Sequence, residues 1–225
     1  GTTRSGVYAR LDDEVELDGL LERRERREPL AYVLGEWGFR RLTLKTDSRA
    51  LVPRPETETV VERALTLLRD VDAPRVLDIG VGSGAIALAI KDERPDARVV
   101  GVDVSPAALS LAGENADRLD LDVELREGDE SAAAEGWDLV VSNPPYVESL
   151  EGLQPELEHE PRVALVGFDM HESITRQAKT HALVFEVGDD QADAVAEILR
   201  RTRYRDVTVT NDLAGVPRVV DGIRD

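Results

Sequence analysis

The sequence predicts a doubly wound α/β fold built on a mostly parallel sheet of seven strands that ends in an antiparallel pair. Two observations support this fold class. From residue 74 onward, short apolar segments alternate with segments of helical periodicity, which is the pattern of right-handed βαβ units with helices on both faces of a sheet. The last two apolar segments alternate in polarity and flank a turn-forming stretch, 211–215, as closing antiparallel strands do.

The first fifty residues are expected to form a small unit ahead of the main domain. Apolar residues at helical spacing within 11–21 predict a helix. The mixed charges of 22–28 predict a solvated helix face. The alternating residues 41–45 predict one strand of a β-hairpin. Residues 1–50 are therefore expected to be a helical segment with a hairpin.

The main domain, residues 51–225, is expected to begin with a helix and to contain all seven strands. Pro55 suits the first position of that helix. Ser105, followed by proline, is expected to cap a later helix, and Asp189 or Asp190 is expected to cap the helix that contains Val195. One more helix is predicted at 172–179. The strands are predicted at 75–79, 98–103, 121–125, 137–142, 182–187, 205–210 and 216–220.

Composition excludes several classes of site and partner. The chain of 225 residues is 41% hydrophobic, has no cysteine and carries a formal net charge of −18. Cysteine-ligated zinc and disulfides are thus impossible, and His159, His171 and His181 show no metal-ligand spacing and are expected on the surface or in loops. No apolar run approaches the roughly 20 residues of a membrane span. A soluble cytoplasmic monomer is expected, and the negative charge argues against a nucleic-acid partner.

A glycine-rich turn between a strand and a helix predicts a nucleoside cofactor. Gly80, Gly82 and Gly84 follow the strand that contains Asp78, and Asp103 ends the next strand. Glycines let the backbone approach a ligand, and an acid about 20 residues further on can accept ribose hydroxyls. The spacing meets the pyrophosphate fingerprint only loosely, and two acids suit a cation-bearing nucleoside. S-Adenosyl-L-methionine is therefore favoured over a nicotinamide dinucleotide.

The segment Asn143-Pro144-Pro145-Tyr146 predicts a substrate site at the end of the fourth strand. The prolines end the strand, and Pro144 holds Asn143 extended. The side-chain oxygen of Asn143 and the backbone oxygen of Pro144 can each accept one N–H from a planar NH2 group, on which Tyr146 can pack. Asn143, Pro144 and Tyr146 are the candidate catalytic residues, and Pro145 completes the substrate site. A proline-rich strand exit with a buried asparagine remains the alternative.

These motifs together resemble the bacterial protein-glutamine methyltransferases that modify peptide-chain release factors, the HemK/PrmC family. The resemblance implies a Rossmann-like S-adenosylmethionine-dependent methyltransferase fold. It also implies methyl transfer to the amide nitrogen of the glutamine in the Gly-Gly-Gln motif of class 1 release factors. It extends over about residues 29–218 and is carried by segments 29–35, 52–58, 78–84, 143–146, 160–165 and 186–191.

The resemblance also implies roles for single residues. Gly80, Gly82, Gly84 and Asp103 would hold the cofactor, and Asp129 would contact its adenine end. Asp78, Glu130 and Asn143 complete the set of residues expected to bind the cofactor. Asn143, Pro144 and Tyr146 would hold the glutamine amide, and Arg54, Glu56 and Glu58 would brace the pocket. The sequence departs from the family in three places: Glu130 stands where an aromatic residue is common, residues 167–181 are shorter, and the N-terminal helical domain is largely missing.

Two alternatives remain open from the sequence. The first is a nucleic-acid methyltransferase that acts on an exocyclic amine, which needs the same loop; the net charge of −18 argues against it. The second is a protein that binds the cofactor without catalysis. The complete loop of residues 143–146 argues against that alternative.

Overall fold

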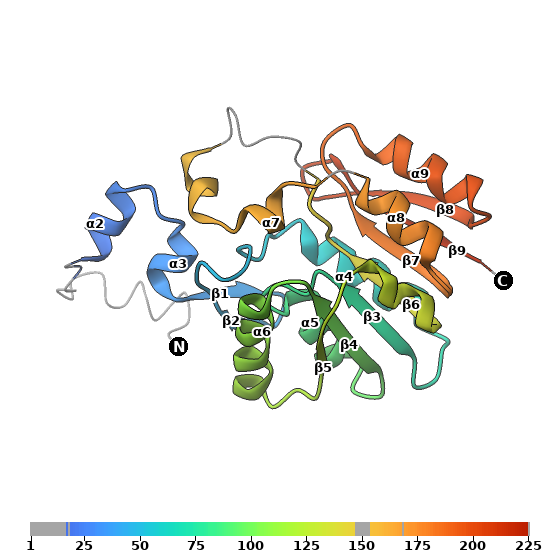
Figure 1. Ribbon diagram of the computed structural model, residues 1–225, viewed down its shortest axis with the longest axis horizontal. Coiled ribbons are helices and arrows are strands. Elements are labelled where there is room, and N and C mark those ends of the chain that lie inside the picture. The colour runs from blue at the N-terminus through green and yellow to red at the C-terminus, as the bar shows by residue number, and fades with distance from the viewer. Residues whose placement is uncertain (1–16, 18, 147–153, 168, 225) are drawn as a thin grey trace.

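A computed structural model describes residues 17, 19–146, 154–167 and 169–224. Its central sheet has seven strands in the order β5-β4-β3-β6-β7-β9-β8 (Figure 1). Strands β3 to β7 are parallel, whereas β9 runs antiparallel to both β7 and β8. The strands are β3 Arg75–Ile79, β4 Arg98–Asp103, β5 Glu124–Glu127, β6 Trp137–Ser142, β7 Thr180–Glu186, β8 Arg205–Asn211 and β9 Pro217–Ile223. The predicted fold class is confirmed.

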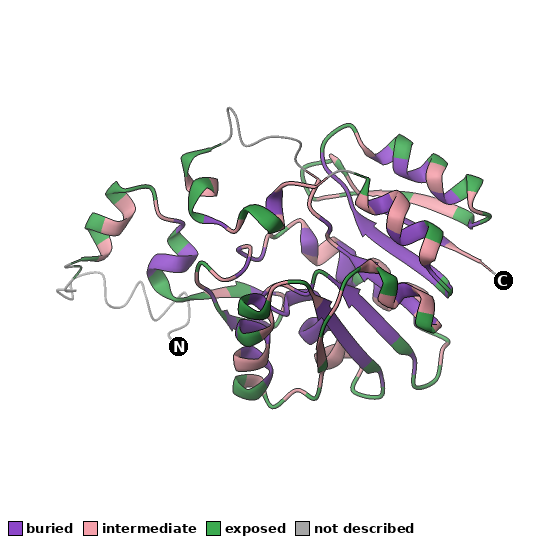
Figure 2. Cartoon of the chain, in the orientation of Figure 1, coloured by how far each residue is buried: buried purple, intermediate pink, exposed green. Residues whose placement is uncertain are grey.

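Helices cover both faces of this sheet because successive residues of a strand point to opposite sides. In β3, Val76 belongs to the apolar cluster under α4, α5 and α6, while Leu77 belongs to the cluster under η1, α8 and α9. Both side chains are fully buried, which explains why the central strands have continuous apolar sequences (Figure 2). The helices are α4 Thr57–Leu67, α5 Ala85–Glu93, α6 Pro106–Leu119, η1 Glu130–Glu135, α8 Met170–Gln177 and α9 Ala192–Arg201.

The segment before the main sheet forms two short helices and the predicted hairpin. These elements are α2 Leu20–Glu25, α3 Leu30–Leu34, β1 Glu36–Phe39 and β2 Leu42–Lys45. Phe39 and Leu44 are buried in the same cluster as α4 and α5. The side chain of Asn115 on α6 accepts from the backbone N–H of Lys45 over 2.7 Å and donates to the oxygen of Ser83 over 2.9 Å. The hairpin is thus tied to the glycine-rich turn.

Several element boundaries differ from the sequence prediction. Helix α4 begins at Thr57, two residues after Pro55, because the backbone N–H groups of Thr57 and Glu58 reach back only three residues in a tighter first turn. The predicted cap of α9 at Asp189 or Asp190 was wrong. Gln191 precedes this helix, and its side-chain oxygen accepts from the N–H of Gly188 over 3.0 Å.

Two further elements and one residue lie elsewhere than predicted, and most of one predicted helix lies outside the described residues. The third strand begins at Glu124, three residues later than expected, and α8 begins at Met170, two residues earlier. The exposed position predicted for His171 was wrong: this residue is buried on α8, where its ring meets the edge of Phe185. Most of the helix expected within 11–21 lies outside the described residues, and the boundary predicted at residue 50 stays a prediction.

Two elements not yet described lie on the connection from β6 to β7. They are η2 Pro155–His159 and α7 Arg162–Leu165. Within the described part of the chain, none of the helices combines the length and the apolar character that crossing a bilayer requires. The described residues also hold no group of three or more potential metal-ligating side chains.

Candidate active site

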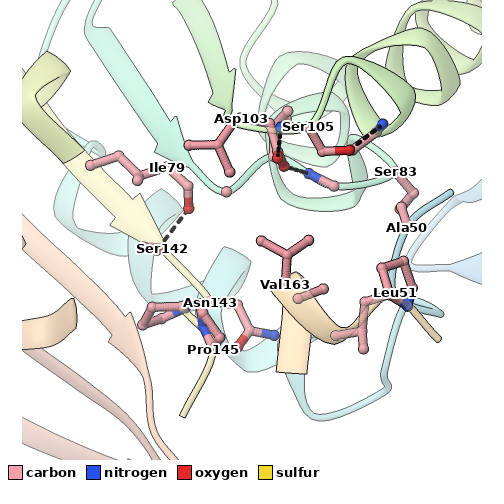
Figure 3. A pocket seen from close by; sticks show the side chains of 18 of the residues that line it. Ala50, Leu51, Ile79, Ser83, Asp103, Ser105, Ser142, Asn143, Pro145 and Val163 are labelled. Carbon is pink, nitrogen blue, oxygen red and sulfur yellow. Dashed lines mark hydrogen bonds between the residues drawn. The ribbon is translucent and has the colours of Figure 1, made fainter. Parts of the chain in front are cut away.

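A cavity of about 350 Å³ lies at the carboxyl ends of β3, β4 and β6 (Figure 3). Strand register places it there, because Ile79 pairs with both Val102 and Ser142. The next residue in each strand direction, Gly80, Asp103 and Asn143, therefore lies at the same edge of the sheet. Since β4 and β6 flank β3 on opposite sides, this is the switch point at which doubly wound sheets bind their ligands. Segments 49–54 and 161–167 form the remaining walls.

The glycine-rich turn needs all three of its glycines. Gly80, Gly82 and Gly84 have φ values of 75°, 55° and 87°, in the left-handed region that other residues adopt only with strain. Gly80 and Gly82 line the cavity. A Cβ added at Gly80 would meet no atom within 4 Å, whereas one at Gly84 would lie 2.8 Å from Cδ1 of Leu88. The first two glycines thus leave backbone open to a ligand, and the third allows α5 to pack.

Asp103 is fixed with its carboxylate at the cavity. Its Oδ2 accepts from the N–H of Gly82 over 2.9 Å, and its Oδ1 accepts from the N–H of Ser105 over 2.9 Å (Figure 3). Each carboxylate oxygen can accept further hydrogen bonds. A ligand with neighbouring hydroxyl groups would therefore find an oriented acceptor at the end of β4.

Asp78, also predicted to hold the cofactor, lies beneath the turn and is not among the residues that line the cavity. It is fully buried, and its Oδ2 accepts from the N–H of Ala87 over 3.0 Å. Among the described residues, no partner reaches its Oδ1. Burial raises the pKa of Asp78 to about 7. Its contact with a cofactor stays a prediction.

Asp129 and Glu130 also line the cavity. Asp129 precedes η1 and accepts from the N–H of Ser131 over 2.9 Å. The hydrogen bonds from Ser131 hold the pKa of Asp129 below its usual range. Glu130 accepts from the hydroxyl of Ser173 over 2.9 Å, which ties this wall to α8. Both predicted residues therefore lie at the cavity.

The Asn143-Pro144-Pro145-Tyr146 loop forms the wall opposite Asp103. Asn143, Pro144 and Pro145 line the cavity, whereas Tyr146 does not. A Cβ added at Gly188 would lie 2.9 Å from Cδ2 of Tyr146, so the phenol ring packs on that glycine. Burial raises the pKa of Tyr146 to about 12, which keeps the phenol neutral. The loop thus brings an amide and backbone carbonyls to the cavity that holds the glycine turn.

Comparison with known proteins identifies the family. A family model described as the methyltransferase small domain matches residues 61–160. The release factor glutamine methyltransferase of Caulobacter vibrioides is 39% identical over 247 residues, which cover 100% of this chain and 86% of that protein. The enzyme of the same name from Geobacter sulfurreducens is 41% identical and covers 99% of this chain and 84% of its own length. The chain belongs to the family of release factor glutamine methyltransferases.

The resemblance predicted from the sequence is thereby confirmed. Among solved structures, the N-terminal domain of human METTL16 in complex with SAH is similar at a TM-score of 0.61, with 96% of this chain and 97% of that chain covered. At 16% sequence identity, this likeness shows the fold alone. It agrees with the methyltransferase fold expected of a release factor glutamine methyltransferase.

Glu160 supports this methyltransferase site in a way that sequence reasoning missed. It is buried after η2 and accepts from the N–H of Val52 over 3.0 Å. It also forms an ion pair with Arg54, a predicted bracing residue that lines the cavity. These contacts fasten segment 49–54 to segment 161–167. The motif at 160–161 was part of the family resemblance, but its partner 106 residues away could not be found from spacing.

The other two predicted bracing residues lie away from the cavity lining. Glu58 accepts from the N–H of Arg40 over 2.9 Å and so anchors the hairpin to α4. Glu56 precedes α4, and its negative charge helps to raise the pKa of the buried Glu186. Thr57, between them, donates to Glu186 over 2.6 Å. Neither Thr57 nor Glu186 was predicted as a site residue, although both belong to segments that carried the resemblance.

Proposed function

We propose that this protein transfers a methyl group from S-adenosyl-L-methionine to the side-chain amide nitrogen of a glutamine in a class 1 peptide-chain release factor. The glutamine is that of the Gly-Gly-Gln motif. One observation supports this most directly: the carboxylate of Asp103 and the acceptors of Asn143 and Pro144 line the same cavity. A methyl donor and an amide can therefore meet there.

The residues at the cavity fit the cofactor. Asp103 presents an oriented carboxylate for ribose hydroxyls, and the open backbone at Gly80 and Gly82 allows close approach. Asp129 and Glu130 would face the adenine end. Bound S-adenosyl-L-methionine supplies an electrophilic methyl group on a sulfonium cation. Three carboxylates, Asp103, Asp129 and Glu130, line the cavity, and their negative charge suits a cationic ligand.

Catalysis by this site would be a matter of placement. An amide nitrogen is a weak nucleophile because its lone pair is delocalised into the carbonyl group. Hydrogen bonds from its two N–H groups to Asn143 and Pro144 would increase electron density on nitrogen and direct it toward the methyl carbon. Such near-attack placement can contribute up to about 7–11 kcal/mol.

The proton balance needs no strong base before transfer. As the new N–CH3 bond forms, the S–CH3 bond breaks, and the sulfur keeps the electron pair and loses its charge. The nitrogen then carries a surplus proton that is strongly acidic and passes to water. The carbonyl oxygens of Asn143 and Pro144 stabilise these N–H groups as their acidity rises.

Methyl transfer to a release factor tests this function. With radiolabelled methyl donor, we expect label on the release factor, none on its Gln→Ala version, and none on duplex DNA or RNA. Asn143→Ala should lower kcat by at least about 100-fold, since loss of one oriented acceptor in a reaction site costs that order. Asn211→Ala, at an exposed position of β8, should leave kcat unchanged. Label on nucleic acid instead, or full activity of Asn143→Ala, would overturn the proposal.

A further inference from the structure

The amide of Asn143 is held by two buried side chains from other elements. Its Nδ2 donates to the hydroxyl oxygen of Thr57 over 3.4 Å, and that hydroxyl donates to Oε2 of Glu186 over 2.6 Å. Thr57 begins α4 and is 4% exposed, and Glu186 ends β7 and is 1% exposed. Because Ser142 of β6 pairs with Phe185 of β7, the residues that follow them, Asn143 and Glu186, lie next to each other at the carboxyl ends of these two strands.

The direction of this chain of hydrogen bonds follows from its buried end. An ionised carboxylate can only accept, so the Thr57 hydroxyl must donate its single hydrogen to Glu186. Its oxygen is then left to accept from Asn143. The group of Asn143 that faces Thr57 must therefore be NH2, because a reversed amide would set its oxygen against another acceptor. The oxygen Oδ1 of Asn143 is left for the cavity.

We propose that Thr57 and Glu186 are positioning residues that hold Asn143 with its side-chain oxygen toward the substrate amide. This inference rests on the proposed function, in which that oxygen accepts an N–H of the glutamine. Without the two residues, the side-chain amide of Asn143 could rotate by about 180° and exchange the positions of its oxygen and its NH2 group. Its NH2 group would then oppose the NH2 group of the substrate.

Protonation of Glu186 would release this constraint. A protonated carboxyl group can donate to Thr57, and the hydroxyl is then free to point toward Asn143. Burial raises the pKa of Glu186 to about 7, even though the Thr57 hydrogen bond lowers it. The nearby charged or titratable side chains are Arg54, Glu56, Tyr146, His171 and Arg218. We therefore expect kcat to fall as pH falls through about 7.

Three variants test the positioning role. Thr57→Val keeps the shape but removes the hydroxyl, and should lower kcat about tenfold or more while the Kd for S-adenosyl-L-methionine stays within about twofold. Thr57→Ser should restore kcat to within about threefold of wild type. Thr175→Val is the matched control: Thr175 is 1% exposed and donates only to the His171 oxygen within α8 over 2.6 Å. An equal loss in the control, or no rescue by serine, would overturn the inference.

The pH profile gives a second readout that a merely structural role would not change. In wild type, kcat should decline on the acid side with an apparent pKa near 7. Glu186→Gln keeps an acceptor for Thr57 but cannot titrate there, so this decline should vanish. If Glu186→Gln shows the same acid limb as wild type, Glu186 does not control the orientation of Asn143.

A measurement without substrate separates this inference from the proposed function. The sequence has three asparagines, Asn115, Asn143 and Asn211, so 15N-asparagine labelling yields few side-chain signals, and Asn143→Asp assigns the relevant pair. These NH2 signals should shift between pH 6 and pH 8 in wild type and lose that shift in Thr57→Val. Identical signals in both proteins would overturn the inference even if the release factor is methylated. The expected shift would uphold it even if the release factor is not.

Discussion

At the residue scale, the site depends on buried acids that are placed under its loops rather than in its cavity. Asp78 anchors the first turn of α5, which follows the glycine turn, through the N–H of Ala87, and Glu186 supports Asn143 through Thr57. Burial raises the pKa of both acids to about 7. Keeping them ionised therefore costs folding free energy, and each is stabilised only partly by its hydrogen bonds.

The free-energy cost of burying the ionised Asp78 should make the stability of the protein depend on pH. Its pKa is higher in the folded chain than in the unfolded chain, so its proton favours the folded state. Stability from this group is fully present below pH 3.8 and is lost as pH rises to about 7. Asp78→Asn should remove this dependence. Relative to wild type, we expect the variant to gain about 2–3 kcal/mol between pH 5 and pH 8.

Urea unfolding of wild type and Asp78→Asn without cofactor, at pH 5 and pH 8, provides the measurement. Other titrating groups are common to both proteins and cancel in the difference. The variant leaves one amide hydrogen-bonding group unsatisfied at both pH values, which shifts both differences equally. If the stability difference between the two proteins is the same at pH 5 and pH 8, Asp78 does not titrate as the structure indicates.

At the element scale, the cavity is closed by two segments that lie far apart in the sequence. Segment 49–54 precedes α4, and segment 161–167 contains α7. Glu160 joins them through the N–H of Val52 and through Arg54. Since one buried carboxylate holds both segments, it controls the walls of the cavity on the side away from the sheet.

Glu160→Ala should loosen these walls. It leaves the Val52 N–H unsatisfied and removes the partner of Arg54, and we expect a loss of about 2–4 kcal/mol in stability. The Kd for S-adenosylhomocysteine, measured by calorimetry, should rise at least about fivefold. Glu62→Ala is the control, since Glu62 forms an exposed ion pair with Arg40 and should change stability by less than about 1 kcal/mol. If Glu160→Ala binds the cofactor with unchanged affinity, the contacts of Glu160 with Val52 and Arg54 do not hold the cavity walls in place.

At the scale of the whole molecule, the sequence predicts those features that depend on residues close together in the chain: the strands, the glycine turn and the proline-rich loop. The strands that contain Leu77 and Val100 were located because strands buried on both faces have continuous apolar sequences. The glycine turn and Asp103 were placed together because a strand–turn–helix and the next strand form one local unit. The Asn-Pro-Pro-Tyr loop was placed because prolines end a strand.

The remainder depends on contacts between distant segments. Thr57 and Glu186 are 129 residues apart in the sequence, and the acid at the end of β7 has no sequence feature that distinguishes it from a surface acid. Asp78 was singled out from the sequence as a cofactor residue, but its burial against the N–H of Ala87, outside the cavity lining, follows from the packing of α5. His171 was misplaced for a related reason, since only the fold shows that α8 covers Phe185. The supporting role of such residues can be recognised only in the folded structure, where the distant segments are in contact.

The most direct test of the central claim is to map the methyl group on a class 1 release factor by tandem mass spectrometry after incubation with this protein and S-adenosyl-L-methionine. We expect one added methyl group on the glutamine of the Gly-Gly-Gln motif, located on its side-chain nitrogen, and far less methylation by Asn143→Ala in the same time. A methyl group on another residue, or an unmodified glutamine with fully active cofactor binding, would contradict the claim that the loop at 143–146 presents a glutamine amide to the methyl donor.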